Sequence, residues 1–174
     1  ISSCQFFKLP AGMQRRLHQN SRVPGKVYVT GHRVSKVGPY HTALEYDDGT
    51  SPRWISAGPQ GKSVEGFERL VGGVGSETNR VRTSDEPKRN RTLGIVTPPK
   101  GMTTNGYFNV LIEAAGNYTN SVDYDLFANV TISNSYNSNS YVSGLLNATG
   151  GKSSVNMRNF VGGEKPLPKR YFGY

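Results

Sequence analysis

The sequence predicts an α+β fold, with a mainly antiparallel sheet and helices packed on one side of it. Segments with alternating apolar and polar residues, rich in β-forming residues, fill the first hundred positions, whereas helical periodicity appears only in the second half. The length of 174 residues fits one domain. Within it, we expect an irregular basic segment over residues 1–23 and a folded core over residues 24–170.

The first two strands are predicted to form a hairpin. Residues 26–34 and residues 40–46 both alternate, and the short connection between them contains Gly38 and Pro39. The length of this turn places His32 roughly opposite His41 on the neighbouring strand.

Three further segments extend the predicted sheet. Residues 53–56 form a third strand, the glycine-rich stretch 58–75 holds one more irregular strand, and residues 93–97 form a strand that ends at a Pro-Pro pair. Residues 76–91 are polar and are expected to form a long mobile loop.

Two helices are predicted in the second half. Thr103 or Thr104 caps the first, which ends near Gly116, and the second begins around Ser138 and ends at Gly150. The proline-containing C-terminal segment is expected to be extended.

Composition excludes several classes of protein. Hydrophobic residues make up 34% of the chain, which is enough for a packed core, and no apolar run reaches the length of a membrane span. Cys4 is the single cysteine, so neither an internal disulfide nor a thiolate metal cluster is expected. Motifs for metal or nucleotide binding are missing, and we expect no cofactor.

The net charge of +9 is unevenly distributed. Basic residues dominate residues 1–100 and 152–174, whereas residues 101–151 hold no Lys or Arg. Such a charge favours an anionic partner or serves solubility alone. No zinc-finger spacing, basic zipper or aromatic RNA-binding motif accompanies it, so nucleic acid is not an expected partner.

The chain begins with Ile1 and its first thirty residues lack the apolar core of a signal peptide, so it is interpreted as an excised domain or a processed fragment. Four triplets have the form of N-glycosylation acceptors and are interpreted as accidental in a chain rich in Asn, Ser and Thr. They begin at Asn90, Asn117, Asn129 and Asn147.

The run of Asn and Ser at residues 136–142 leads directly into the second predicted helix. A hydroxyl at a helix N-terminus meets free backbone N–H groups and the positive end of the helix dipole, which would stabilise an oxyanion. Ser138 is therefore a candidate nucleophile, with Asn137, Asn139 and Ser140 beside the oxyanion. The alternative is that Ser138 or Ser140 is an ordinary N-cap.

General-base candidates are His18, His32 and His41, of which His18 lies in the irregular basic segment. A histidine on a strand is also commonly structural. Asp125 and Asp123 precede the serine-rich run and could orient a histidine or belong to a loop.

Two segments resemble the circularly permuted papain-like superfamily, which includes lecithin–retinol acyltransferase-like enzymes and deubiquitinating-type peptidases. Residues 38–46 are similar to the histidine strand of that group. Residues 137–142, Asn-Ser-Asn-Ser-Tyr-Val, are similar to its Asn-Cys-x-x-Phe-Val helix start, with Ser138 in the cysteine position. The resemblance implies a papain-like layout over residues 24–170, with Ser138 as nucleophile and His41 as base.

Serine in the cysteine position has three explanations: a natural serine hydrolase, an inactivating substitution, or a domain that binds without catalysis. The residue that would orient His41 is left open between His32 and Asp125. Cys4 is a weaker candidate nucleophile, because no helix pattern follows it and it lies near a chain end.

The wider pattern also resembles C-terminal effector domains of Rhs-type and type VI-secreted bacterial toxins. That resemblance implies a secreted antibacterial hydrolase or acyltransferase that is delivered into a target cell. Its substrate would be an amide or ester of peptidoglycan, protein or lipid at the cell envelope or membrane, and its partner a cognate immunity protein. The alternatives are a non-catalytic binding or assembly module and, ranked last, a basic nuclease-like toxin.

Overall fold

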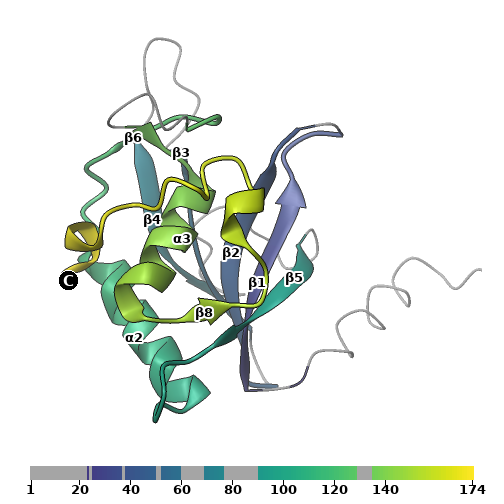
Figure 1. The fold of residues 1–174 in the computed structure, drawn as a ribbon, viewed down its shortest axis with the longest axis vertical. Coiled ribbons are helices and arrows are strands. Elements are labelled where there is room, and N and C mark those ends of the chain that lie inside the picture. The colour runs from purple at the N-terminus through teal and green to yellow at the C-terminus, as the bar shows by residue number, and fades with distance from the viewer. Residues whose placement is uncertain are drawn as a thin grey trace, which may run out of the picture.

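A computed structural model of the chain has the predicted α+β architecture, in which two helices pack against a six-stranded antiparallel sheet (Figure 1). The structure describes residues 23, 25–36, 38–49, 52–59, 69–76, 90–128 and 135–174. Residues 1–22 of the predicted irregular segment 1–23, with Cys4 and His18, and residues 77–89 of the predicted loop 76–91 lie outside the described residues.

The sheet has the strand order β4-β3-β2-β1-β5-β8. Its strands are β1 (Lys26–Arg33), β2 (Tyr40–Asp47), β3 (Arg53–Pro59), β4 (Leu70–Ser76), β5 (Arg91–Thr97) and β8 (Lys152–Ser153). The predicted hairpin is confirmed, and its register pairs His32 with His41. Because paired residues of antiparallel strands point to the same face, these two histidines are neighbours on the sheet.

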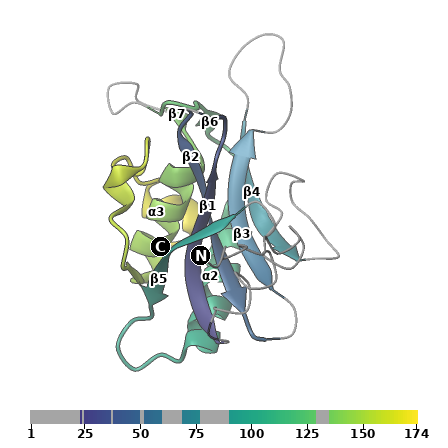
Figure 2. The same cartoon turned by 90° about the vertical axis from the view of Figure 1, so that its right-hand side faces the viewer.

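The two helices are α2 (Thr104–Asn117) and α3 (Ser138–Thr149), and both pack on one face of the sheet (Figure 2). Thr103 caps α2, because its side-chain oxygen accepts a hydrogen bond from the Gly106 amide at 3.1 Å. Gly150 ends α3 in the left-handed conformation, with φ of 78°. Both predicted helices and their ends are therefore confirmed.

The core lies between this face and the helices. It is formed by apolar side chains of alternate sheet positions and of the inner helix faces, which are buried together. Its largest fully buried members are Tyr107, Tyr141, Phe108, Phe172, Leu44, Ile55, Leu70, Leu111, Leu145 and Leu167.

The structure differs from the sequence prediction in the length of one strand and in several short elements. Strand β3 continues to Pro59, three residues beyond the predicted end. A parallel pair joins β6 (Asp123–Tyr124) to β7 (Ser135–Tyr136), and the C-terminal segment contains the 3-10 helices η2 (Met157–Asn159) and η3 (Lys169–Phe172) instead of being wholly extended. Elements of two to four residues carry no periodicity that a sequence pattern could reveal.

Gly144 allows the C-terminal segment to lie directly against α3. A Cβ atom at this position would overlap the backbone of Leu167, whose amide donates to the Ser140 carbonyl at 2.9 Å. We expect Gly144→Ala to lower the free energy of unfolding by about 1–3 kcal/mol, because the segment would have to move. Gly116→Ala in α2 is the matched control, since a Cβ there meets nothing within 4 Å. Equal urea midpoints for the two variants would contradict this packing.

Tyr107 joins the two helices through its hydroxyl, which lies 2.8 Å from Thr149 Oγ1. Burial raises the pKa of Tyr107 from 10.0 to about 12, so the folded state holds this proton more tightly than the unfolded chain. The resulting stabilisation is complete below pH 10 and is lost as the pH rises through about 12. It amounts to about 2–3 kcal/mol.

Urea unfolding as a function of pH tests this expectation. The free energy of unfolding of the wild type is expected to fall through the alkaline range, and the Tyr107→Phe variant is expected to show a shallower fall. Burial also raises the pKa values of Tyr118 and Tyr141, so part of the fall stays in the variant. If the free energy of unfolding fell equally steeply with pH in the wild type and in Tyr107→Phe, ionisation of Tyr107 would not contribute to the alkaline loss of stability.

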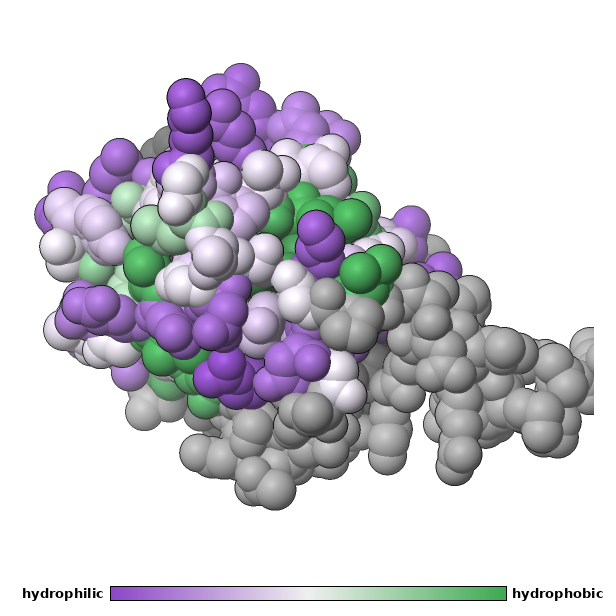
Figure 3. Space-filling view, turned by 90° about the horizontal axis from the view of Figure 1, so that it is seen from below, coloured by the Kyte–Doolittle hydropathy of each residue, from purple (hydrophilic) through white to green (hydrophobic). Residues whose placement is uncertain are grey.

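The outer surface carries both polar and apolar residues. On the face seen in Figure 3, apolar residues form small groups among polar ones. None of the described helices is both long and apolar enough to span a membrane.

Candidate active site

Asn139, in the first turn of α3, lies at the open edge of β2. Strand β3 pairs with β2 only from Leu44 to Tyr46. Beyond that point the edge is taken by the Asn139 side chain, whose Nδ2 donates to the Tyr40 carbonyl at 2.8 Å and whose Oδ1 accepts from the Thr42 amide at 3.0 Å. The Asn139 side chain therefore takes the place of a neighbouring strand for the backbone of Tyr40 and Thr42, the residues before and after His41.

The remaining hydrogen-bonding capacity of the Asn139 amide is also used. Oδ1 accepts from Thr42 Oγ1 at 2.8 Å, and Nδ2 donates to the Val161 carbonyl at 2.9 Å. Asn139 is 1% exposed. The N-terminus of α3 is thus fixed by one side chain to a strand almost a hundred residues earlier and to a loop about twenty residues later.

The N-cap of α3 is Asn137, and not Ser138 or Ser140 as the capping alternative supposed. Asn137 has extended backbone angles, and its Oδ1 accepts from the amides of Asn139 at 2.9 Å and Ser140 at 3.0 Å. Its Nδ2 donates to the carbonyls of Leu126 and Val161. Asparagine suits the N-cap position here because its side-chain amide accepts hydrogen bonds from the helix and also donates hydrogen bonds to two loops.

The two serines of this turn differ in what their hydroxyls do. Ser140 is fully buried, and its Oγ donates to the Gly162 carbonyl at 2.7 Å. The Ser138 hydroxyl donates to Asn139 Oδ1 at 3.5 Å, which is at the long limit of a hydrogen bond. Ser138 is therefore the serine whose hydroxyl is held only weakly.

The predicted oxyanion donors are largely occupied. The cap uses the backbone amides of Asn139 and Ser140, which leaves the amide of Ser138 in the first turn. No acceptor for the Ser138 amide is found within the described part of the chain. An oxyanion at this helix end would therefore be held by the amide of Ser138 itself.

His41 lies between the two residues whose backbone Asn139 binds, and it is 6% exposed. The structure therefore brings the backbone of the histidine strand and the start of α3 together. The side chains of Thr42 and Leu44 face α3 and the core, so alternation along β2 directs the His41 ring to the opposite face of the sheet, beside His32. Among the described residues, no hydrogen bond joins Ser138 to His41.

The ring of His32 lies beside that of His41, with centroids 5.2 Å apart and planes at 47°. His32 Nδ1 lies 2.7 Å from the Oδ1 atom of Asn90, which directly precedes β5. Asn90 is a residue of this site that sequence reasoning missed, because its one sequence signal was a glycosylation triplet.

Asp125 is not brought to a histidine by the contacts that the structure describes. Its carboxylate accepts from the Phe127 amide at 3.0 Å and from Ser135 Oγ at 3.4 Å, so it joins the turn after β6 to the first residue of β7. It also faces Lys165, whose pKa is lowered by burial, an effect that the Asp125 charge opposes. Of the two candidates for orienting His41, the geometry favours His32.

No protein-family model, curated protein or solved structure gives a significant match to this chain. The function of the site is therefore argued from its own geometry.

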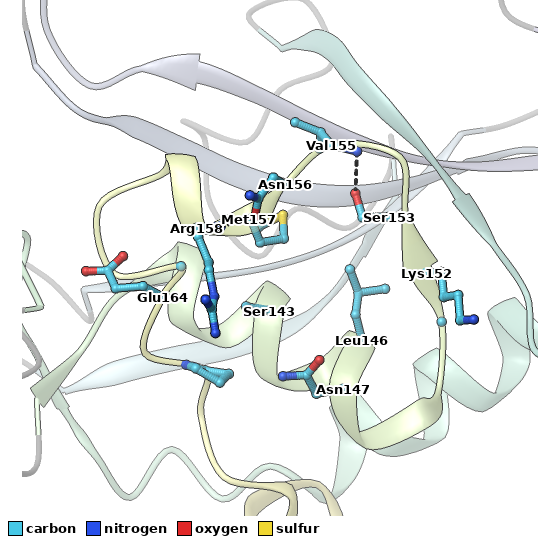
Figure 4. A pocket seen from close by; sticks show the side chains of 13 residues that line it. Ser143, Leu146, Asn147, Lys152, Ser153, Val155, Asn156, Met157, Arg158 and Glu164 are labelled. Atoms are coloured by element: carbon cyan, nitrogen blue, oxygen red, sulfur yellow. Dashed lines mark hydrogen bonds between the residues drawn. The ribbon is translucent and has the colours of Figure 1, made fainter.

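A cavity of about 500 Å³ lies beside α3, between its outer face and residues 151–166 (Figure 4). Ser143, Leu146 and Asn147 form its helical wall, and Arg158 extends over it from η2. The cavity reaches Gly163, next to the glycine that binds Ser140, so it begins close to the first turn of α3. Within the described residues, no group of His, Cys, Asp and Glu side chains could hold a metal ion.

Proposed function

We propose that this chain is a hydrolase or acyl-transfer domain with a permuted papain-like arrangement, in which Ser138 is the nucleophile and His41 the base. The observation that supports it is the pair of hydrogen bonds by which the Asn139 amide fixes the start of α3 to the backbone on either side of His41. The reaction also requires the His41 ring to turn from the opposite face of the sheet toward Ser138. Through them, two motifs separated by almost a hundred residues meet, in the order that the resemblance implies.

The proposed chemistry follows from the helix start. His41 takes the Ser138 hydroxyl proton as Ser138 Oγ attacks the carbonyl carbon of an amide or ester. The Ser138 amide and the positive helix end stabilise the oxyanion. His41 then gives the proton to the departing amine or alcohol, leaving an acyl group on Ser138, which water or an acceptor hydroxyl removes.

The burial of the site indicates that it must open to react. Ser138 is 3% exposed and His41 6% exposed, so a substrate reaches them only after local movement. As context for this activity, we propose a secreted antibacterial effector that acts at the cell envelope and is neutralised by an immunity protein. The net charge of +9 favours attraction to an anionic surface.

The same burial favours a second candidate, a non-catalytic binding or assembly module. In that case the first turn of α3 would be a structural junction, in which Asn137 and Asn139 join the helix to β2 and to the loop at Val161. A serine in the cysteine position agrees with this candidate as well.

Covalent labelling separates the two candidates. The wild-type chain is incubated with a fluorophosphonate probe and with activated acyl esters, and the adduct is located by peptide mass spectrometry. The hydrolase proposal predicts one adduct on the peptide that contains Ser138, formed at least about a hundredfold more slowly in His41→Asn, which lacks the general base. A folded wild type that acquires no adduct on Ser138 would favour the binding module.

A further inference from the structure

We propose that the cavity beside α3 binds a small organic carboxylate, whose charged group is held by Arg158 and whose apolar part packs against Leu146 and Met157. A guanidinium, two neutral polar side chains and an apolar surface face the same space of about 500 Å³ (Figure 4). A hydrolase and a binding module could each carry such a site, so it stands apart from the proposed function.

The walls of the cavity are fixed to the rest of the fold. On the sheet side, the Ser154 amide donates to the Ile95 carbonyl at 2.8 Å. On the helix side, Ser140 Oγ donates to the Gly162 carbonyl at 2.7 Å. Between these two points, the side chain of Met157 belongs to the core. A ligand therefore enters a space that is already formed, and little ordering of the chain opposes its binding.

Two side chains of α3 offer hydrogen-bonding groups to this space. Ser143 lines the cavity one turn beyond Ser140 and is 7% exposed. In contrast to the Ser140 hydroxyl, the Ser143 hydroxyl has no hydrogen-bond partner among the described residues. The side-chain amide of Asn147, one turn further along the same wall, also has no partner in the described part of the chain. Both groups can therefore donate to a ligand without breaking a bond of the fold.

Arg158 gives the cavity its charge. Its side chain extends from η2 toward the helical wall, whereas the side chains of Glu164 and Lys152 point outward at the two ends of the cavity (Figure 4). Within the described residues, the Arg158 guanidinium has neither a carboxylate nor another hydrogen-bond partner. The Arg158 backbone is held by its amide, which donates to Asn156 Oδ1 at 3.0 Å. A guanidinium presents two parallel N–H groups, which match the two oxygens of a carboxylate.

The rest of the lining favours an organic carboxylate over inorganic phosphate. One inward-facing cation balances a single negative charge, whereas a phosphate group near neutral pH carries more than one. Leu146, Val155 and Met157 add apolar surface to the lining. Burial of a hydrocarbon part against these side chains would add to the affinity. The lining therefore fits a carboxylate that carries an apolar body of several carbon atoms.

Titration of the full chain with phenylbutyrate tests the proposal. Amide NMR follows the backbone signals of Ser143 and Asn147 and the Nε–H signal of Arg158, and saturable shifts of all three are expected. The neutral analogue phenylbutyramide lacks the charge, and inorganic phosphate lacks the apolar part. Each is expected to bind at least about tenfold more weakly than phenylbutyrate.

Arg158→Gln is expected to weaken the binding of phenylbutyrate by about ten- to a hundredfold, because it removes a charged hydrogen bond. Ser143→Ala removes a neutral donor and is expected to weaken it by about two- to tenfold. Arg170→Gln is the matched control and should bind as the wild type does, since Arg170 does not line the cavity and its guanidinium lies over the Tyr171 ring.

Two results would overturn the site itself: no saturable shift in the wild type, or an unchanged Kd in folded Arg158→Gln. Equal binding of phenylbutyramide, or tighter binding of phosphate at the same signals, would overturn the assignment to a carboxylate. Neither result depends on whether Ser138 is labelled, so the proposed function is tested separately.

Discussion

Replacement of Asn139 by alanine is expected to lower the free energy of unfolding by about 3–5 kcal/mol, the largest effect on stability that the structure indicates. The variant leaves the Tyr40 carbonyl and the Thr42 amide without the side-chain partner they have in the native protein, and it removes one of the two donors to the Val161 carbonyl. The site is buried, so water cannot replace the lost amide without an opening of the fold.

Urea denaturation followed by circular dichroism measures this loss, with Asn109→Ala as the control for the same change at an exposed helical position. Asn139→Asp is a sharper variant. Its carboxylate can still accept from Thr42, but it cannot donate to the two carbonyls and brings a charge into a buried place. A midpoint for either Asn139 variant close to that of the wild type would show that α3 is held to β2 by other contacts.

Ser138→Ala and Ser140→Ala are expected to have opposite effects, which makes them the most decisive pair for function. Ser138→Ala should reduce turnover of an activated ester by at least about a thousandfold, since it removes the proposed nucleophile. Its effect on stability should stay below about 1 kcal/mol, because its hydroxyl makes only a hydrogen bond of 3.5 Å.

Ser140→Ala should keep most of the turnover and lose about 1 kcal/mol of stability. It removes the donor at 2.7 Å from the Gly162 carbonyl, which keeps the Lys165 amide at 3.1 Å as a second donor. Both variants are measured for ester turnover and for urea midpoint. Equal turnover in Ser138→Ala and the wild type would remove Ser138 from the mechanism, whatever the stabilities are.

The main elements of the fold could be predicted because their periodicity is local. The hairpin of β1 and β2, strand β5 and helices α2 and α3 each carry their own alternation or capping residues. The two-residue strands β6, β7 and β8 could not be predicted, because they are defined only by partners distant in the sequence. The C-terminal 3-10 turns likewise have no apolar repeat of their own.

The candidate site was predictable in part for the same reason. Ser138 and His41 stand out within short motifs, and the His32–His41 pairing follows from the length of the turn. The structural role of Asn139 could not be predicted, because a pattern does not show which side chain reaches a strand edge almost a hundred residues away. Asn90 follows a long polar stretch without periodicity, so no local signal connected it with His32.

Hydrogen exchange of the Thr42 amide measures how often the site opens. Its proton is held by a side chain of α3 instead of a strand neighbour, so it exchanges with solvent only when the helix end separates from β2. Amides inside the β1–β2 ladder, such as those of the paired residues Thr30 and Ala43, require a larger unfolding event. The difference in exchange protection between these two kinds of amide therefore measures the free energy of the local movement that would admit a substrate to Ser138.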